Sequence, residues 1–429
     1  MNYLWRSDNA DTDEDIMRFL AGDDVVLDRE LLPYDIAATT AHAEGLARIG
    51  IFNDAELEQV SQALQAIAED FASGALVLDQ RFEDGHSALE SWLCERVGDL
   101  GARIHTGRSR NDQVLVATRL YLRDALDHLV HLCRLSAETC LQQAGQYRGV
   151  PMAGYTHLQR AVVSTVEVWF AGYAEAFIDD AMIARATREW INANPLGTAA
   201  GFGVNLDLDR EYTTEALGFD RLQLNPAYTQ NSRGKFEIQA LTALSQALLD
   251  VRRLAWDLSL FTTAEFGSVT LPEAYTTGSS IMPNKRNPDV VELLRAACAT
   301  VDGAITEINS VLSLPGGYHR DLQATKGPTL RAFHRGLAAL GLLPALLSEV
   351  RFDHDKLREA IEPAMYATDR AIELAAKGVA FRDAYHEVKK SVTDGETRTP
   401  EDSIAARISA GAAGNPRLDI LQQRLAALK

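Results

Sequence analysis

The feature that most constrains the fold is a long stretch without glycine or proline, between Gly234 and Gly267. Its apolar residues recur at steps of three and four, at Ile238, Leu241, Leu244, Leu248, Val251, Leu254, Leu258 and Phe261. These positions lie on one side of a helix about 30 residues, or roughly 45 Å, long. A helix of this length buries its apolar side only against other long helices, which indicates an elongated bundle.

Other parts of the chain repeat this period. Long helices are expected over residues 111–144, 164–192 and 288–311, and a shorter one over 54–73. Strand signals are weak, and the best alternation, at 203–209, is short. We therefore predict an all-α protein.

The pattern changes near residues 106 and 352. We place domain boundaries at these points, because a chain of this length exceeds one ordinary core. The predicted domains are an N-terminal helical domain (1–106), a central bundle of long helices (107–352) and a C-terminal helical domain (353–429).

The charge of the chain argues against several kinds of partner. It has 42 basic and 60 acidic side chains and a net charge of −18. Such a surface repels nucleic acid and anionic membranes, so we expect neither as a partner. The sequence shows no basic–apolar signal, no apolar run of about 18 residues and no C-x-x-C pair among its four cysteines. A soluble cytoplasmic protein is expected.

The first of three dense polar clusters is His105-Thr-Gly-Arg-Ser-Arg-Asn-Asp-Gln113. Ser109 and Asp112 have the spacing of a capping box, which is the purely structural interpretation. That interpretation leaves Arg108 and Arg110 unexplained. Two cations at a helix N-terminus oppose the helix dipole unless an anion also lies there. The cluster therefore favours an anion site.

The second cluster is Gly154-Tyr-Thr-His-Leu-Gln-Arg160, ahead of the helix expected over 164–192. His157 suits proton transfer near neutral pH. A lone histidine is often structural, so the cluster by itself supports either interpretation.

The third cluster, Gly278-Ser-Ser-Ile-Met-Pro-Asn-Lys-Arg-Asn-Pro-Asp289, is the most specific. Asn287 suits a helix N-cap and Pro288 the first helical position. Lys285 then lies beside free backbone N–H groups, which favours carboxylate binding. Two serines on the preceding loop indicate a lid that carries a reactive group. An ordinary surface loop is the alternative.

A weaker fourth patch follows the helix expected over 288–311. Tyr318, Arg320, Gln323 and Lys326 would add hydrogen-bond donors for a carboxylate.

The spacing of the clusters bears on assembly. The first begins the helix over 111–144 and the second follows its end. A helix of about 34 residues separates its ends by roughly 50 Å, too far for side chains to meet. If both clusters serve one site, they come from different copies of the chain. We therefore predict a homo-oligomer with composite sites and closed symmetry.

The cluster at 278–289 resembles the signature loop of the fumarase/aspartase superfamily. The clusters at 105–113 and 154–160, with Tyr318-x-x-Asp-Leu-Gln323, are similar to the argininosuccinate lyase family, which includes the delta-crystallins. The similarity runs from about residue 30 to the end. It implies a homotetramer with a twenty-helix core, four sites each shared by three subunits, and no metal or organic cofactor.

The resemblance also implies roles for particular residues in releasing fumarate from argininosuccinate, the last step of arginine biosynthesis. It implies that Ser279 takes the proton from the carbon next to a succinyl carboxylate. His157 is linked with the opposing proton transfer, to the leaving nitrogen. Lys285 belongs to the same loop as Ser279, and Glu292 supports the histidine. The substrate contacts it implies are Asn111, Thr156, Asn287, Tyr318, Gln323 and Lys326. Arg110, in the first cluster, is counted with them.

The chain departs from the family pattern near its N-terminus, and its C-terminal domain is short for the family. The opening of the chain, residues 4–9, differs from the usual one, and Asp24 stands where a serine that touches substrate is expected. Three alternatives stay open: another fumarate-releasing lyase such as adenylosuccinate lyase, a catalytically idle crystallin-like structural protein, and a helical binding module whose polar ends only cap helices.

Overall fold

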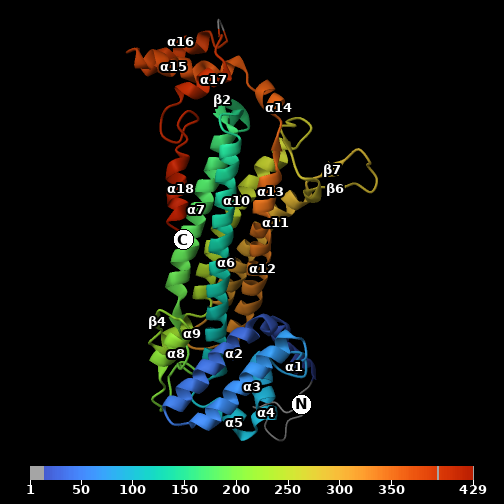
Figure 1. The fold of residues 1–429 in the computed structure, drawn as a ribbon, viewed down its shortest axis with the longest axis vertical. Helices are drawn as coiled ribbons and strands as arrows, with labels where there is room; N and C mark the ends of the chain where they lie inside the picture. The colour runs from blue at the N-terminus through green and yellow to red at the C-terminus, as the bar shows by residue number, and fades with distance from the viewer. Residues whose placement is uncertain (1–13, 394–395, 429) are drawn as a thin grey trace. The chain divides into compact units, whose positions relative to one another are not determined.

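The structure is a computed structural model that describes residues 14–393 and 396–428. It is mostly helical (Figure 1). Its contacts divide it into two compact units. Unit 1 comprises the chain up to His128 with Ala184–Ala243 and Asp302–His334, and unit 2 comprises Leu129–Ile183, Leu244–Val301 and Arg335–Lys429. Each boundary between them falls inside a long helix.

The long helices lie where the periodicity predicts them. They are α6 (Arg110–Gln146), α7 (Val166–Ile191), α10 (Lys235–Phe261) and α11 (Asp289–Val311), and the shorter helix is α3 (Asp54–Ala72). The stripe predicted in α10 is buried, with Leu241, Leu244, Leu248, Val251 and Leu258 fully enclosed. The structure is thus mostly helical, which confirms the helical part of the all-α prediction.

Unit 1 has a core built from its N-terminal helices. These are α2 (Asp24–Arg48), α3, α4 (Gly85–Val97) and α5 (Asp99–Arg103). Their shared core includes Leu32, Leu46, Phe52, Leu64, Ile67, Leu89 and Leu93. The helix α1 (Glu14–Ala21) precedes them. The segment between α7 and α10 also belongs to unit 1. It contains the short helices α8 (Arg210–Ala216) and α9 (Pro226–Asn231) and the short parallel strands β3 (Ala193–Asn194) and β4 (Arg221–Leu222).

Unit 2 contains an antiparallel hairpin that the sequence did not predict. The hairpin consists of β1 (Pro151–Thr156) and β2 (Gln159–Thr165), so α7 begins at Val166 rather than Ser164. Ala153 and Val163 bury one face of it against Met365 and Tyr366. The weak alternation at 203–209 forms no strand.

The rest of unit 2 is made of short elements. Two more antiparallel pairs are β5 (Val269–Thr270) with β8 (Arg351–Phe352), and β6 (Thr277–Gly278) with β7 (Arg286–Asn287). The C-terminal helices are α13 (Leu343–Glu349), α14 (His354–Glu359), α15 (Ala367–Ala376), α16 (Phe381–Lys390), α17 (Pro400–Ala406) and α18 (Leu418–Ala426).

One stretch of the described chain, Arg320–Glu349, is long and apolar enough to cross a membrane. It contains η2 (Arg320–Thr325), α12 (Lys326–Gly341) and α13. Half of its apolar window is buried within the fold.

Candidate active site

The hairpin of unit 2 presents His157 at its tip. Thr156 pairs with Gln159, so His157 and Leu158 form a two-residue turn. Both have positive φ, 55° and 58°, and both are exposed. Two-residue hairpin turns with this geometry normally use Asn and Gly, because a side chain in the left-handed region costs about 1–2 kcal/mol. Strain kept at a side chain suited to proton transfer is typical of a functional site.

Ser279 lies at the start of the loop that β6 and β7 close. The pairs Thr277–Asn287 and Gly278–Arg286 hold the two ends of this loop together. The Ser279 Oγ accepts hydrogen bonds from the backbone N–H of Met282 at 3.1 Å and of Ile281 at 3.4 Å. Donors aimed at a hydroxyl oxygen stabilise the negative charge that it gains on losing a proton.

The start of α11 follows the same loop. Asn287 belongs to β7, and the helix begins at Asp289, whose carboxylate accepts a hydrogen bond from Thr277. The Pro288 carbonyl accepts from the N–H of Glu292 at 3.0 Å, so Pro288 acts as the cap in place of the predicted Asn287. The exposed Glu292 carboxylate lies 4.0 Å from Arg295.

Unit 1 contains the first and fourth clusters. The Arg110 guanidinium, at the start of α6, pairs with Glu83 at 3.2 Å and with Asp84. Arg320 also pairs with Glu83, at 3.0 Å. The anion predicted beside Arg110 is therefore supplied by the chain itself, from the residues just before α4.

Lys326 lies at the start of α12 with only 3% of its side chain exposed. Its Nζ lies 3.0 Å from Asp24 Oδ1 and 2.5 Å from Asp28 Oδ1. Asp28 also accepts the N–H of Gly85 at 2.9 Å, which connects α2 to the start of α4. The Asp24 that replaces an expected serine is thus a direct partner of a predicted substrate contact.

The other predicted contacts of unit 1 are less enclosed. The Gln323 amide donates to the carbonyls of Leu20 at 3.2 Å and Ala21 at 3.4 Å, at the end of α1. Tyr318 is exposed, and Asn111 is half-buried in the first turn of α6. Residues 4–9, where the opening departs from the family pattern, lie outside the described part of the chain.

Two buried carboxylates that support this region were missed as functional residues. Asp35 accepts from His86 Nδ1 at 2.7 Å and from the Gln113 amide at 2.8 Å, so it connects α2 to the starts of α4 and α6. Burial raises the pKa of Asp35, but the charge and hydrogen bond of His86, together with the charge of Arg108 and the hydrogen bond of Gln113, outweigh it, so that the pKa lies below its usual value. The sequence shows only isolated polar residues at these positions.

The second such carboxylate is Asp112, which the sequence indicated only as a capping residue. It does accept the N–H of Ser109, at 2.9 Å. It also accepts the N–H groups of Gly197 at 2.9 Å and Ala199 at 2.8 Å, and Ala199 has a φ of 51°. Asp112 therefore fixes a distant loop as well as its own helix start. Burial raises its pKa, while these hydrogen bonds oppose the rise.

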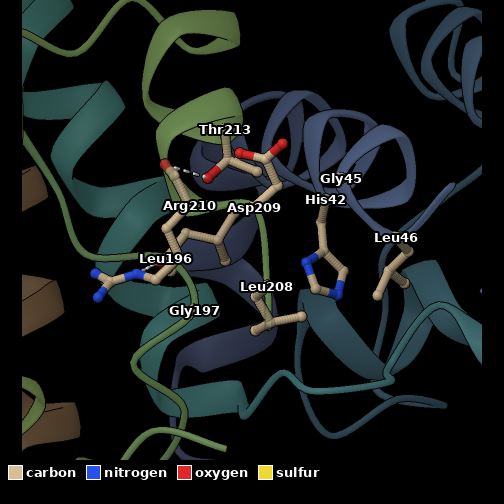
Figure 2. A pocket seen from close by; sticks show the side chains of 9 residues that line it. All are labelled: His42, Gly45, Leu46, Leu196, Gly197, Leu208, Asp209, Arg210 and Thr213. Atoms are coloured by element: carbon tan, nitrogen blue, oxygen red, sulfur yellow. Dashed lines mark hydrogen bonds between the residues drawn. The ribbon is translucent and has the colours of Figure 1, made fainter. Parts of the chain in front are cut away.

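A small cavity of unit 1 is lined by His42, Leu46, Leu208 and Arg210 among others (Figure 2). Its volume is about 10 Å³, room for about one water molecule, so it holds no substrate. The buried His42 ring lies 3.0 Å from the Thr106 carbonyl. Burial, followed by the charge of Arg108, lowers the pKa of His42 to about 3, so this histidine is neutral in the fold.

The predicted residues lie on separate elements of the two units. In unit 1, Arg110 pairs with Glu83 and Asp84 just before α4, and Lys326 pairs with Asp24 and Asp28 of α2. Unit 2 carries Thr156 and His157 on one hairpin, and Ser279, Lys285, Asn287 and Glu292 on a second loop and the helix after it. No group of three His, Cys, Asp or Glu side chains in the described residues is arranged to hold a metal ion.

Comparison with known proteins decides the family. A family model described as lyase matches residues 10–303. An argininosuccinate lyase of Stenotrophomonas maltophilia is 57% identical over 426 residues, covering 99% of both chains. One of Xanthomonas euvesicatoria is 57% identical over 429 residues, covering 100% of this chain and 99% of that protein. The chain belongs to the argininosuccinate lyase family. It is therefore a lyase, as the family resemblance implied.

Solved structures confirm the fold of this family member. An EDDS lyase in complex with formate has a TM-score of 0.80 at 22% identity, covering 96% of this chain and 90% of that one. A class II fumarase from Schistosoma mansoni has a TM-score of 0.70 at 16% identity, covering 87% of this chain and 90% of that one. At these identities the likeness concerns the fold alone.

Proposed function

We propose that the chain cleaves argininosuccinate to arginine and fumarate by β-elimination, as the last step of arginine biosynthesis in the cytoplasm. The observation that carries the proposal is the loop of Ser279, whose Oγ receives two backbone N–H groups at 3.1 and 3.4 Å. The family membership identifies the substrate, because the relatives at 57% identity are argininosuccinate lyases.

The elimination needs a base, an acid and a sink for charge. Ser279, as an alkoxide stabilised by the N–H groups of Ile281 and Met282, takes a proton from the carbon next to the succinyl carboxylate. The electron pair of that C–H bond forms the double bond of fumarate, and the C–N bond breaks. His157 is linked with delivery of a proton to the leaving nitrogen, and Glu292 supports it.

The substrate is held at both of its ends. Lys285 and Asn287, beside the N-terminus of α11, hold the succinyl carboxylates, where cation and helix dipole act together. The remaining contacts proposed are Arg110, Asn111, Thr156, Tyr318, Gln323 and Lys326. The chemistry uses side chains and backbone groups, and we propose no metal or organic cofactor for it.

The active unit that we propose is a homotetramer with a twenty-helix core and sites shared between subunits. The support is the length of α6, an unbroken helix of 37 residues, which is about 55 Å long. The first cluster begins this helix and the second follows its end. The domains proposed within each subunit are 1–106, 107–352 and 353–429.

The test is the absorbance of fumarate released from argininosuccinate, with adenylosuccinate assayed in parallel. We expect release from argininosuccinate alone. In Ser279→Ala, kcat should fall by about a hundredfold or more with little change in KM. Ser280→Ala, the neighbouring serine, is the matched control and should retain kcat. Release from adenylosuccinate, or from neither compound, would overturn the assignment of substrate, and full activity of Ser279→Ala would remove Ser279 as the base.

A further inference from the structure

Unit 2 contains a cleft beside the hairpin that presents His157. Its volume is about 470 Å³, within the range of about 300–1,000 Å³ that is typical of small-molecule sites. The hairpin forms one wall, and the end of α10, the segment that follows it and α14 form the others. None of the proposed catalytic or substrate-contacting residues is among the described residues that line it.

Three aromatic rings line this cleft as a connected group. The ring centroids of Tyr155 and Phe266 are 5.6 Å apart, and those of Phe266 and Phe261 are 6.4 Å apart. Tyr155 and Phe266 are only half-buried, so part of each ring is accessible. Aromatic faces attract cations, and the flat guanidinium group stacks on them especially well. The rings therefore favour a ligand that carries a guanidinium group.

The charged side chains of the cleft leave one carboxylate over. Lys356 pairs with Glu359 at 3.0 Å, and Arg160 pairs with Glu362. Glu265 also lines the cleft and is exposed, and no ion pair in the described part of the chain includes it. Exposed pairs are weak, so the two cations can exchange their partners for the carboxylate of a ligand. The cleft thus offers two cations for a carboxylate and one unpaired carboxylate for a cation.

We propose that this cleft is a regulatory site for L-arginine, the product of the proposed function on which the inference rests. The guanidinium group stacks on Tyr155 and Phe266 and pairs with Glu265, and the α-carboxylate pairs with the cations on the opposite walls. Arginine carries one net positive charge, which neutralises the carboxylate left over. Argininosuccinate and fumarate carry net negative charge, so the site discriminates against both.

A ligand in this cleft contacts the turn that carries His157. Leu158 lines the cleft and adjoins His157, and both residues have positive φ. Bound arginine holds this turn in one conformation, and a catalytic group on a turn that adjusts during turnover is slowed when the turn is held. Arginine should therefore lower kcat, whereas a product that only competes with the substrate raises KM.

Calorimetry of L-arginine with the full-length protein tests binding. The variant is Glu265→Gln, and Glu387→Gln, the same substitution at an exposed position of α16, is the matched control. Wild type and control should bind arginine at the cleft and at the active site. In Glu265→Gln the cleft should bind it about tenfold or more weakly. L-citrulline, in which a neutral urea replaces the guanidinium group, should show the same loss at the cleft of the wild type.

The proposal fails if Glu265→Gln keeps every arginine site of the wild type, if citrulline fills the cleft as tightly as arginine, or if no arginine binds up to about 10 mM. Melting temperatures show whether the variants are folded. The proposed function can fail separately, since a protein that loses an arginine site in Glu265→Gln but releases no fumarate refutes only the reaction.

Steady-state kinetics test the regulatory role. At saturating argininosuccinate, arginine should lower the kcat of the wild type and of Glu387→Gln by about twofold or more. Glu265→Gln should keep the kcat of the wild type without arginine and lose this inhibition. Inhibition of the wild type that is confined to KM, or that persists unchanged in Glu265→Gln, would show that the cleft does not regulate the reaction.

Discussion

Thr156 and Gln159 face each other as the last residue pair of the β1–β2 hairpin, and the two residues between them, His157 and Leu158, are both left-handed. The strain of this turn is accessible to experiment, because 69% of Leu158 is exposed and little packing depends on it. Leu158→Gly should raise the free energy of unfolding by about 0.5 kcal/mol, since glycine adopts positive φ without strain but loses more entropy on folding.

Urea denaturation at fixed protein concentration measures this change. Leu224→Gly provides the control, since Leu224 is equally exposed and has no positive φ. It should lower the free energy of unfolding. Equal losses in the two variants would show that the turn holds no strain.

His157→Asn tests the imidazole without disturbing its backbone, because asparagine tolerates the left-handed region better than other residues do. We expect kcat to fall by about a hundredfold or more, with KM changed little, when fumarate release is followed. A loss confined to KM would make His157 a binding residue.

Asp112→Ala should lower the free energy of unfolding by about 3 kcal/mol. The substitution removes the acceptor of three N–H groups, those of Ser109, Gly197 and Ala199, and leaves the buried groups of Gly197 and Ala199 without this partner. Asp112→Asn keeps one side-chain oxygen and should lose less. Chemical denaturation measures the free energy of unfolding of both variants. If Asp112→Ala loses no more than Asp112→Asn, the three hydrogen bonds do not stabilise the fold as predicted.

His42 should make stability depend on pH in the acid range. Its pKa is about 3 in the fold, below the ordinary 6.5, so only the unfolded chain takes up a proton between these values. The stabilisation is complete above about pH 6.5 and is lost as the pH falls toward 3, by up to about 1.4 kcal/mol per pH unit.

The variant His42→Gln should flatten this dependence when the free energy of unfolding is measured between pH 7 and 4. The same substitution at the exposed His334 controls for the change of side chain. Equal slopes in wild type and His42→Gln would show that His42 already carries a proton in the fold.

The sequence predicted the long helices closely, because each buries an apolar stripe whose period is visible in the residues themselves. The ends of α6 and α10 agree with the predicted ends to within a few residues. The β1–β2 hairpin was missed because its turn is His157-Leu158, where a pattern search expects Asn and Gly. His157 and Leu158 are unusual residues for a turn with positive φ, and for the same reason the sequence did not predict the two strands that flank them.

The polar clusters were found, but their partners were not. Arg108 and Arg110 stood out as cations at a helix start, and the sequence alone called for an external anion there. For Arg110, Glu83 and Asp84 supply it from a segment more than twenty residues earlier. The buried Arg108 instead donates to the Thr39 hydroxyl of α2. The pairing of Lys326 with Asp24 and Asp28 spans about three hundred positions, and no local pattern encodes such a contact.

The loop between β6 and β7 also has a consequence for handling the protein. Ile281 in this loop is 82% exposed, and Lys285 and Arg286, which follow it in the sequence, are exposed too. Trypsin should cleave here before it attacks the buried helices. If a bound dicarboxylate draws the loop inward, fumarate will protect this peptide bond, and the rate of proteolysis will then measure occupancy without any turnover.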